Sequence, residues 1–205
     1  MIIPVCVTGK LEVVGGTTSM DINSLNNEFY DCISDALKKF STSTKNQDVF
    51  AIAFDCDSSV GQIVLRYRNK TSFECKKSRY EEYQHKYGWP IYGLWGSEYD
   101  VGEFEIIEYQ PTENVKHFTD SYYYHEVGNY YGLGEPIEDI KDDYRKIYWS
   151  MIVNTINRLK AEISNLGICT TDNFIIFHCD HDESQEERKE KISMTVDNAM
   201  IEFLI

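Results

Sequence analysis

The hydrophobic pattern of the chain is most continuous over residues 48–69, which predicts a β-hairpin at the centre of the fold. The first arm, 48–55, is apolar almost throughout, as in a strand covered on both faces. Residues 56–61 supply Asp, Ser and Gly, which favour a reversal of the chain. The second arm, 62–68, alternates in part, as expected of a less central strand. We therefore expect the other elements to pack around this hairpin.

Apolar residues at helical spacing predict three helices. The first covers 21–40, with Asp21 as a suitable N-cap. The second covers 73–87, where Phe and Tyr share one helical face and Gly88 follows as a C-terminal cap. The longest covers 136–166 and begins with acidic residues at its positive end. Together these helices supply apolar faces that must be buried against a sheet.

Five shorter segments complete the predicted pattern. Residues 101–109 and 173–179 have strand-like sequences, and 182–190 is a charged segment that forms either a loop or an exposed helix. Thr195 is expected to cap a short final helix. Residues 1–20 are expected to form an N-terminal extension or a short hairpin.

Helices and strands alternate irregularly along the chain, with hairpins and without an internal repeat or a Pro-rich linker. A chain of 205 residues is long enough to bury a core of its own. We therefore predict one α+β domain over residues 1–205, with a mainly antiparallel sheet and helices packed on it.

The charge of the chain limits its partners. Lys and Arg number 20 against 34 Asp and Glu, so the formal net charge is −14. This charge repels nucleic-acid phosphates and anionic membranes, which excludes both as expected partners. It favours a basic protein partner, with solubility alone as the alternative explanation.

The cysteines and the start of the chain indicate the compartment. The six Cys show neither a disulfide framework nor the spacing of a metal site, so we expect them to be reduced. The first residues lack the basic start of a signal peptide, and no stretch approaches the length of a membrane span. The expected location is cytoplasmic.

Two aromatic segments are candidates for contact with a partner. Residues 89–96 carry two Trp in a turn-rich loop, which predicts a lid over the sheet rather than an exposed patch. Residues 121–132 hold five Tyr among Gly and Asn, a composition typical of antibody paratopes. An irregular strand and loop is the interpretation that the sequence favours for this second segment, and a binding surface is the alternative.

The residues predicted to bind a partner are of two kinds. Aromatic side chains serve as buried anchors of interfaces, and acidic side chains steer the encounter. The predicted anchors are Tyr122, Tyr123, Tyr124, Tyr130 and Tyr131, and the predicted acidic rim is Glu98, Asp100, Glu103 and Glu105. This assignment requires the tyrosines to lie outside the core of the monomer.

The sequence contains no catalytic signature, which favours a protein that is not an enzyme and needs no metal or cofactor. The alternative is a metal-dependent hydrolase that uses His178, Asp180 and His181 at the end of a strand. Closed metal sites usually draw ligands from two separated segments, and no second cluster is evident. Glu103 and Glu105 form a carboxylate pair of the glycosidase type, but alternate Glu on an exposed sheet face is commoner.

Several blocks of the sequence resemble a bacterial family known only as domain of unknown function 4303. The blocks are the first helix 21–40, the strand 49–57, the Trp-bearing segment 87–95 and the late strand 174–177. The resemblance covers roughly residues 21–204. It implies the role of a small acidic immunity protein, which binds and neutralises a cognate bacterial toxin. The chain is also similar to a superfamily of cell-wall regulators, whose bacterial members resemble immunity proteins too.

Taken together, these features predict a non-enzymatic, acidic protein-binding domain. The resemblance narrows this to a bacterial immunity protein, and the charge to one that neutralises a basic toxin such as a nuclease. The metal-dependent hydrolase and a regulatory interaction module without a toxin are the alternatives.

Overall fold

The structure, a computed structural model, describes residues 10–12, 19–59, 61–127, 138–181 and 183–204. The described elements are, in chain order, β1 (Lys10–Glu12), β2 (Ser19–Asp21), α1 (Ile22–Ser41), β3 (Val49–Asp57), β4 (Gln62–Asn69), α2 (Lys70–Tyr87), the 3-10 helix η1 (Val101–Glu103), β5 (Glu105–Ile106), α3 (Glu113–Val127), α4 (Glu138–Glu162), β6 (Thr170–Asp180), α5 (Gln185–Ser193) and α6 (Asn198–Leu204).

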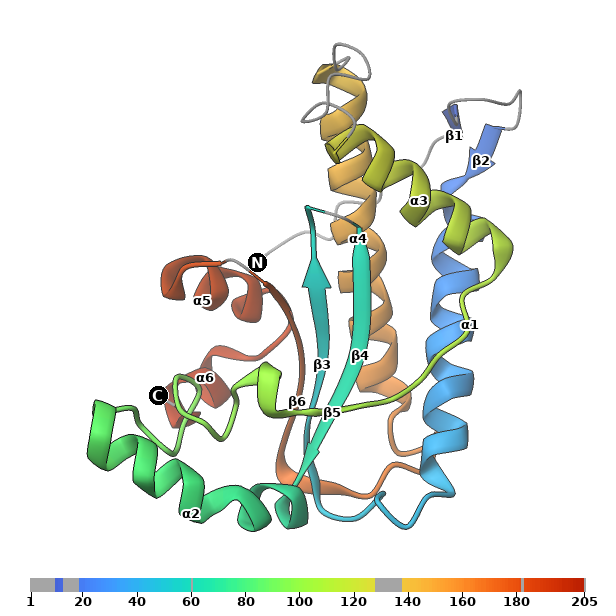
Figure 1. Cartoon of the computed structure of the whole chain (residues 1–205). Coiled ribbons are helices and arrows are strands. Elements are labelled where there is room, and N and C mark those ends of the chain that lie inside the picture. The colour runs from blue at the N-terminus through green and yellow to red at the C-terminus, as the bar shows by residue number, and fades with distance from the viewer. Residues whose placement is uncertain (1–9, 13–18, 60, 128–137, 182, 205) are drawn as a thin grey trace.

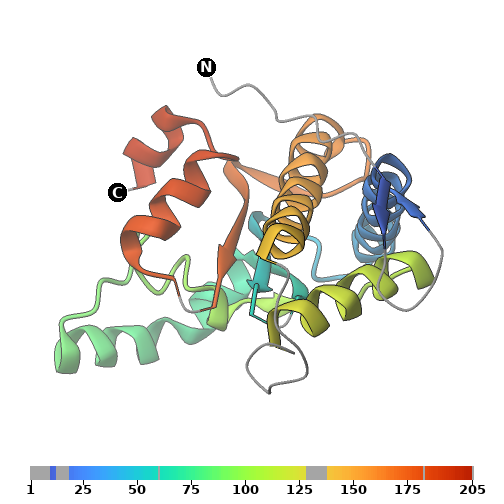
Figure 2. The ribbon, with the colours of Figure 1, turned by 90° about the horizontal axis from the view of Figure 1, so that it is seen from above.

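Helices cover both faces of a four-stranded sheet. The strand order is β5-β4-β3-β6, with β4 antiparallel to both of its neighbours and β6 parallel to β3 (Figure 1). Helices α1, α3 and α4 lie over one face, and α2, α5 and α6 lie over the other (Figure 2). The predicted α+β class with a mainly antiparallel sheet is therefore confirmed. The parallel pair β3–β6 is a feature that the hairpin pattern did not predict.

Strand β3 is buried along almost its whole length, which confirms the predicted central hairpin. From Ala51 onward its side chains alternate between two separate cores, and an irregularity of the strand between Val49 and Ala51 places Phe50 in the same core as Ala51. Phe54 contacts Phe29 of α1 with ring centroids 6.3 Å apart, and Phe50 contacts Tyr99 on the other face at 5.4 Å. Burial of apolar surface on both sides of one strand is the main contribution that stabilises the three layers.

Helix termini follow the local sequence signals. The Asp21 carboxylate accepts the Asn23 backbone N–H at 3.1 Å, which confirms the predicted N-cap of α1. Gly88 has φ 74°, a left-handed conformation that ends α2 as predicted. The charged segment after β6 forms the exposed helix α5 rather than a loop, because Ser184 and Glu187 build a capping box at its start.

Two predicted elements differ from the structure. The strand expected over residues 101–109 is reduced to β5, because Asp100 caps the 3-10 helix η1 in the preceding turn. Thr195 does not cap the final helix. Its hydroxyl donates to the Ile192 carbonyl at 3.4 Å, and α6 begins only at Asn198.

The N-terminal segment includes a short antiparallel pair, in which β1 lies beside β2. This pair falls within the part of the chain expected to be an extension or a short hairpin. Residues 1–9 and 13–18 lie outside the described residues.

Replacement of Phe54 by Ala tests how much the burial of the central strand contributes to stability. Phe54→Ala leaves a cavity between β3 and α1, so we expect the free energy of unfolding to fall by about 3–5 kcal/mol in a urea titration. Ile106→Ala, which truncates an exposed side chain, is the control and is expected to stay within about 0.5 kcal/mol of the wild type. A loss below about 1 kcal/mol in Phe54→Ala would contradict the account.

Candidate aromatic docking site

The five predicted tyrosine anchors cannot be placed as a surface. Tyr122, Tyr123 and Tyr124 belong to helix α3, so the interpretation as an irregular strand and loop is wrong for residues 121–127, while 128–132 lie outside the described residues. Their side chains are outside the described part of the chain, as are Tyr130 and Tyr131 altogether. Their role as anchors therefore stays a prediction.

Three of the four predicted rim carboxylates hold loops of the protein itself. The Glu98 carboxylate accepts the Gly93 N–H at 2.9 Å, and the Asp100 carboxylate accepts the Gly102 N–H at 3.1 Å. The Glu105 carboxylate accepts Lys45 Nζ at 2.6 Å and the Tyr67 hydroxyl at 2.7 Å. Burial alone would raise the pKa of Glu105, but these hydrogen bonds outweigh it and lower the pKa. These carboxylates have intramolecular partners, and their role as a rim for a partner stays a prediction.

The side chain of Arg68 is fully buried at the end of β4, beneath the start of α2. Its guanidinium donates hydrogen bonds to the Tyr80 hydroxyl and to the Glu103 carbonyl. It also lies 5.5–5.8 Å from the ring centroids of Phe73, Tyr80 and Phe104. Such contacts offset the cost of removing a cation from water. Among the described residues, no carboxylate pairs directly with this cation.

The fourth predicted rim residue, Glu103, lies at the outer end of this buried network. Its carboxylate accepts Lys76 Nζ at 3.1 Å, the Tyr80 hydroxyl at 3.2 Å and a hydrogen bond from Arg79. Burial alone would raise the pKa of Glu103, but the neighbouring cations outweigh it and lower the pKa. The Glu103 carboxylate thus contacts two cations directly, and Tyr80 links it to a third, the buried Arg68.

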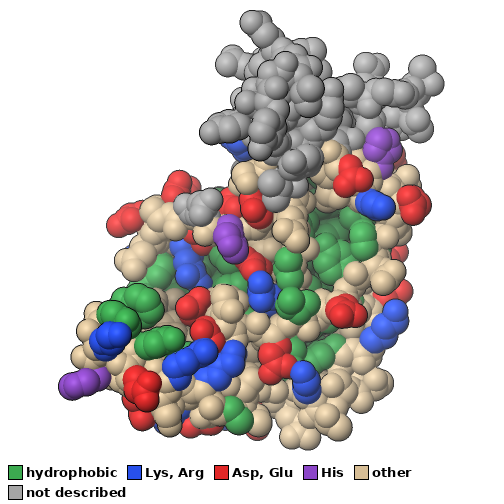
Figure 3. Space-filling view, in the orientation of Figure 1, with side chains coloured by type: hydrophobic (Ala, Val, Ile, Leu, Met, Phe, Trp, Pro, Cys, Tyr) green, Lys and Arg blue, Asp and Glu red, His purple; other side chains and the backbone are tan. Residues whose placement is uncertain are grey.

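Beyond this network, the end of α2 and the loop after it carry four aromatic side chains, Tyr83, Tyr87, Trp89 and Tyr92, which we call the aromatic surface. The first three are mutual neighbours with ring centroids 5.2–6.1 Å apart. Tyr87, Trp89 and Tyr92 are 52%, 56% and 56% exposed. In Figure 3, hydrophobic side chains lie open to solvent beside Lys and Arg at this end of α2. Exposed rings that support one another are typical of a docking surface.

Part of the loop that carries Trp89 covers the core, and another part of it is exposed. Ile91 and Leu94 are buried in the core under α2, as the prediction of a lid requires. The Leu94 N–H donates to the Leu204 carbonyl at 2.7 Å, which ties the loop to α6. Trp89, however, is exposed and contacts Tyr83 and Tyr87 instead of this core, so the lid prediction holds for only part of the segment. Gly96 is required in the loop, because a Cβ there would lie 2.5 Å from the Tyr92 carbonyl oxygen.

The helical spacing of the sequence puts Tyr83 and Tyr87 on the apolar face of α2, which predicts burial and not contact with a partner. On that face only Phe73 and Tyr80 are fully buried. The spacing of Tyr83 and Tyr87, followed two residues later by Trp89, is the signal that was available. This spacing predicts that the rings contact one another. It does not predict that they are exposed, because their exposure depends on where the sheet ends beneath α2.

The three residues of the proposed metal cluster turn to different partners. His178 is buried against Trp149, with ring centroids 5.5 Å apart. The Asp180 carboxylate accepts hydrogen bonds from the Ser58 hydroxyl and backbone. His181 is exposed, with Nδ1 3.7 Å from the nearer oxygen of the Asp55 carboxylate. Within the described ranges, no group of three or more His, Cys, Asp and Glu side chains is arranged to hold a metal ion.

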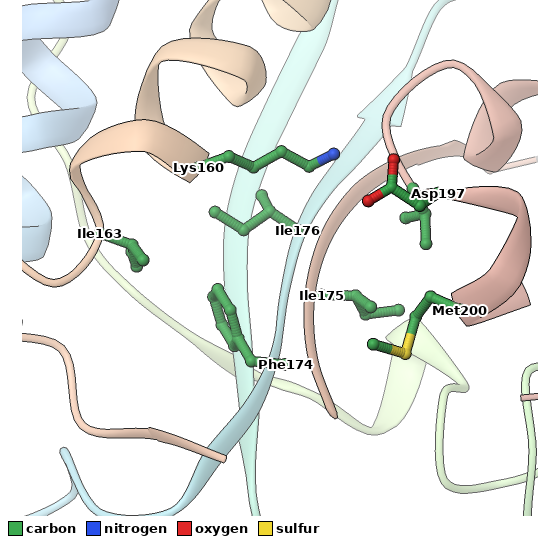
Figure 4. A pocket seen from close by; sticks show the side chains of 8 residues that line it. Lys160, Ile163, Phe174, Ile175, Ile176, Asp197 and Met200 are labelled. Carbon is green, nitrogen blue, oxygen red and sulfur yellow. The ribbon is translucent and has the colours of Figure 1, made fainter. Parts of the chain in front are cut away.

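A pocket of about 230 Å³ lies beside β6, between α4 and α6. Phe174, Ile175 and Ile176 form its apolar floor, and Lys160 extends over this floor toward Asp197 (Figure 4). Burial lowers the pKa of Lys160, and the charge of Asp197 opposes this shift only in part. One ammonium and one carboxylate over an apolar floor can bind a small molecule, but the pocket offers no nucleophile with a paired base.

Comparisons with known proteins do not identify the chain. No family model, no curated protein and no solved structure matches its sequence or its fold. Among the described helices, none combines the length and the apolar character that crossing a bilayer requires.

The buried His178 predicts a pH dependence of stability. Burial, with a contribution from Lys191, lowers the pKa of His178 from 6.5 to about 4. Between these values the unfolded chain binds a proton that the folded chain does not, so stability falls as the pH drops. From pH 7 to pH 4 we expect the wild type to lose about 3 kcal/mol more than His178→Phe in urea titrations. Equal losses in both proteins would contradict the assignment.

Removal of one hydroxyl tests the buried network. Tyr80→Phe leaves the Arg68 guanidinium without one of its acceptors, so we expect a loss of about 1–3 kcal/mol in the free energy of unfolding. Tyr83→Phe makes the same chemical change one helical turn later, on the aromatic surface, and is expected to cost less than about 0.5 kcal/mol. The assignment fails if the two variants are equally stable.

Proposed function

We propose that the protein is a non-enzymatic protein-binding domain that docks through the aromatic surface. The observation that carries this proposal is the exposure of Tyr87, Trp89 and Tyr92 at the capped end of α2 and in the loop anchored beside it. Monomeric proteins seldom leave such rings in contact with water unless a partner covers them. Tyr and Trp are also the side chains that most often supply binding free energy at interfaces.

The scaffold beneath the surface supports the same function. Gly88 and the capped end of α2 fix the position of Trp89, while Ile91 and Leu94 anchor the following loop in the core. A rigid surface loses little conformational entropy when it binds, so a larger part of the contact energy appears as affinity.

The narrower proposal is that the partner is a bacterial toxin and the protein its immunity protein. Its support is the family resemblance of the sequence together with the net charge of −14, which favours a basic partner at long range. A regulatory interaction module is the competing role. Identification of the captured partner separates the two roles, since a toxin encoded next to this chain would support the immunity role and a regulatory protein would overturn it.

Truncation of the rings tests the docking surface. The double variant Tyr87→Ala/Trp89→Ala removes two exposed anchors, so we expect the affinity for the natural partner to fall about 100-fold or more in calorimetry. The free energy of unfolding is expected to change by less than about 1 kcal/mol, because both side chains lie mostly in solvent.

Met194→Ala is the matched control for that experiment. Met194 is also a large exposed apolar side chain, but it lies at the end of α5, outside the aromatic surface. This variant is expected to bind the partner as the wild type does. Full affinity in the Tyr87→Ala/Trp89→Ala variant would show that the partner docks elsewhere.

A further inference from the structure

The aromatic surface carries positive charge in a protein that is strongly negative overall. Helix α2 has five Lys or Arg and three Glu, whereas the whole chain has 20 and 34. Three of these cations lie over rings of the surface: Lys86 Nζ is 4.9 Å from the Tyr87 centroid, Lys77 Nζ is 5.7 Å from that of Tyr92, and the Arg79 guanidinium is 5.9 Å from that of Tyr83.

The charges of α2 are distributed unevenly around the helix. At 3.6 residues per turn, Lys76, Arg79 and Lys86 fall on the same half of the helix as Tyr83 and Tyr87. The three glutamates fall on the opposite half, together with Lys70 and Lys77. The half that presents Tyr83 and Tyr87 therefore carries three cations of α2 and none of its carboxylates, while Lys77 contributes its charge beside Tyr92.

The buried network behind the surface adds to this positive charge. The Glu103 carboxylate faces Lys76, Arg79 and, through Tyr80, the buried Arg68. Three cations against one carboxylate leave a local excess of two positive charges. Arg68 is shielded from water, so its field reaches the surface with less screening than that of an exposed side chain.

From this charge pattern we infer that the aromatic surface binds an acidic segment of its protein partner, one that interleaves Asp or Glu with apolar side chains. The apolar side chains pack on Tyr83, Tyr87 and Trp89, and the carboxylates pair with Lys77, Arg79 and Lys86. This inference rests on the proposed function. The net charge of the chain attracts a basic partner at long range, whereas the aromatic surface is inferred to contact an acidic segment of that partner.

Two synthetic peptides test the inference. They share their length and their Leu and Pro positions, and they carry Glu or Lys at every other position. Because the chain as a whole is negative, long-range attraction favours the Lys peptide, and only a local cationic site reverses this order. We expect the Glu peptide to bind the full chain at least about tenfold more tightly, with amide shifts confined to α2 and the loop after it in NMR spectra. Preference for the Lys peptide, or binding of neither peptide, would overturn the inference.

Charge reversal on the protein completes the test. Lys77→Glu/Lys86→Glu is expected to weaken binding of the Glu peptide about tenfold, while Lys38→Glu/Lys39→Glu on α1 leaves it unchanged. Lys38 and Lys39 are exposed lysines of α1, which covers the opposite face of the sheet, so this double reversal controls for the same change in net charge. Equal effects of both reversals would overturn the inference.

The natural partner then separates the two proposals. Loss of its binding in Tyr87→Ala/Trp89→Ala, without any effect of Lys77→Glu/Lys86→Glu, retains the docking surface and overturns the acidic segment. If neither variant affects binding of the partner, the docking surface itself is wrong. Loss of binding in both variants supports both proposals.

Discussion

The structure depends on the burial of β3 from both sides. This strand pairs with β4 along one edge and with β6 along the other, and its side chains enter two cores. An apolar strand in the middle of a sheet needs helices over both of its faces, because an uncovered face would expose apolar side chains to water. That requirement accounts for the two groups of helices. It also fixes the start of α2, which follows β4 without an intervening loop.

The position of α2 explains why the aromatic surface is exposed. The helix begins at the end of β4, and its first half is held by Phe73, Tyr80 and the network around Arg68. Its second half extends beyond the sheet (Figure 1). The side chains that continue the same helical face, Tyr83 and Tyr87, therefore lie over the Trp89 loop instead of a strand. The same face of α2 is therefore buried in the core at the start of the helix and exposed to solvent at its end.

Sequence reasoning succeeded where one residue and its near neighbours decide the structure. The apolar run of β3, the Asp21 cap and the left-handed Gly88 are local signals, and all three predictions are confirmed. The pairing of Arg68 with Tyr80 and Glu103 was not predictable, since it joins a strand, a helix and a loop in space. The same reason applies to the predicted rim. The sequence predicts that Glu103 and Glu105 face solvent. It does not reveal their ion pairs, because Lys76, Arg79 and Lys45 come from distant segments of the chain.

The most direct test of docking through the aromatic surface is hydrogen–deuterium exchange of the chain with and without its natural partner. The account predicts that the partner slows exchange in the last turns of α2 and in residues 88–96, while α1 and β6 exchange at unchanged rates. Protection confined to α1, β6 or the pocket beside Lys160, with α2 unaffected, would contradict it.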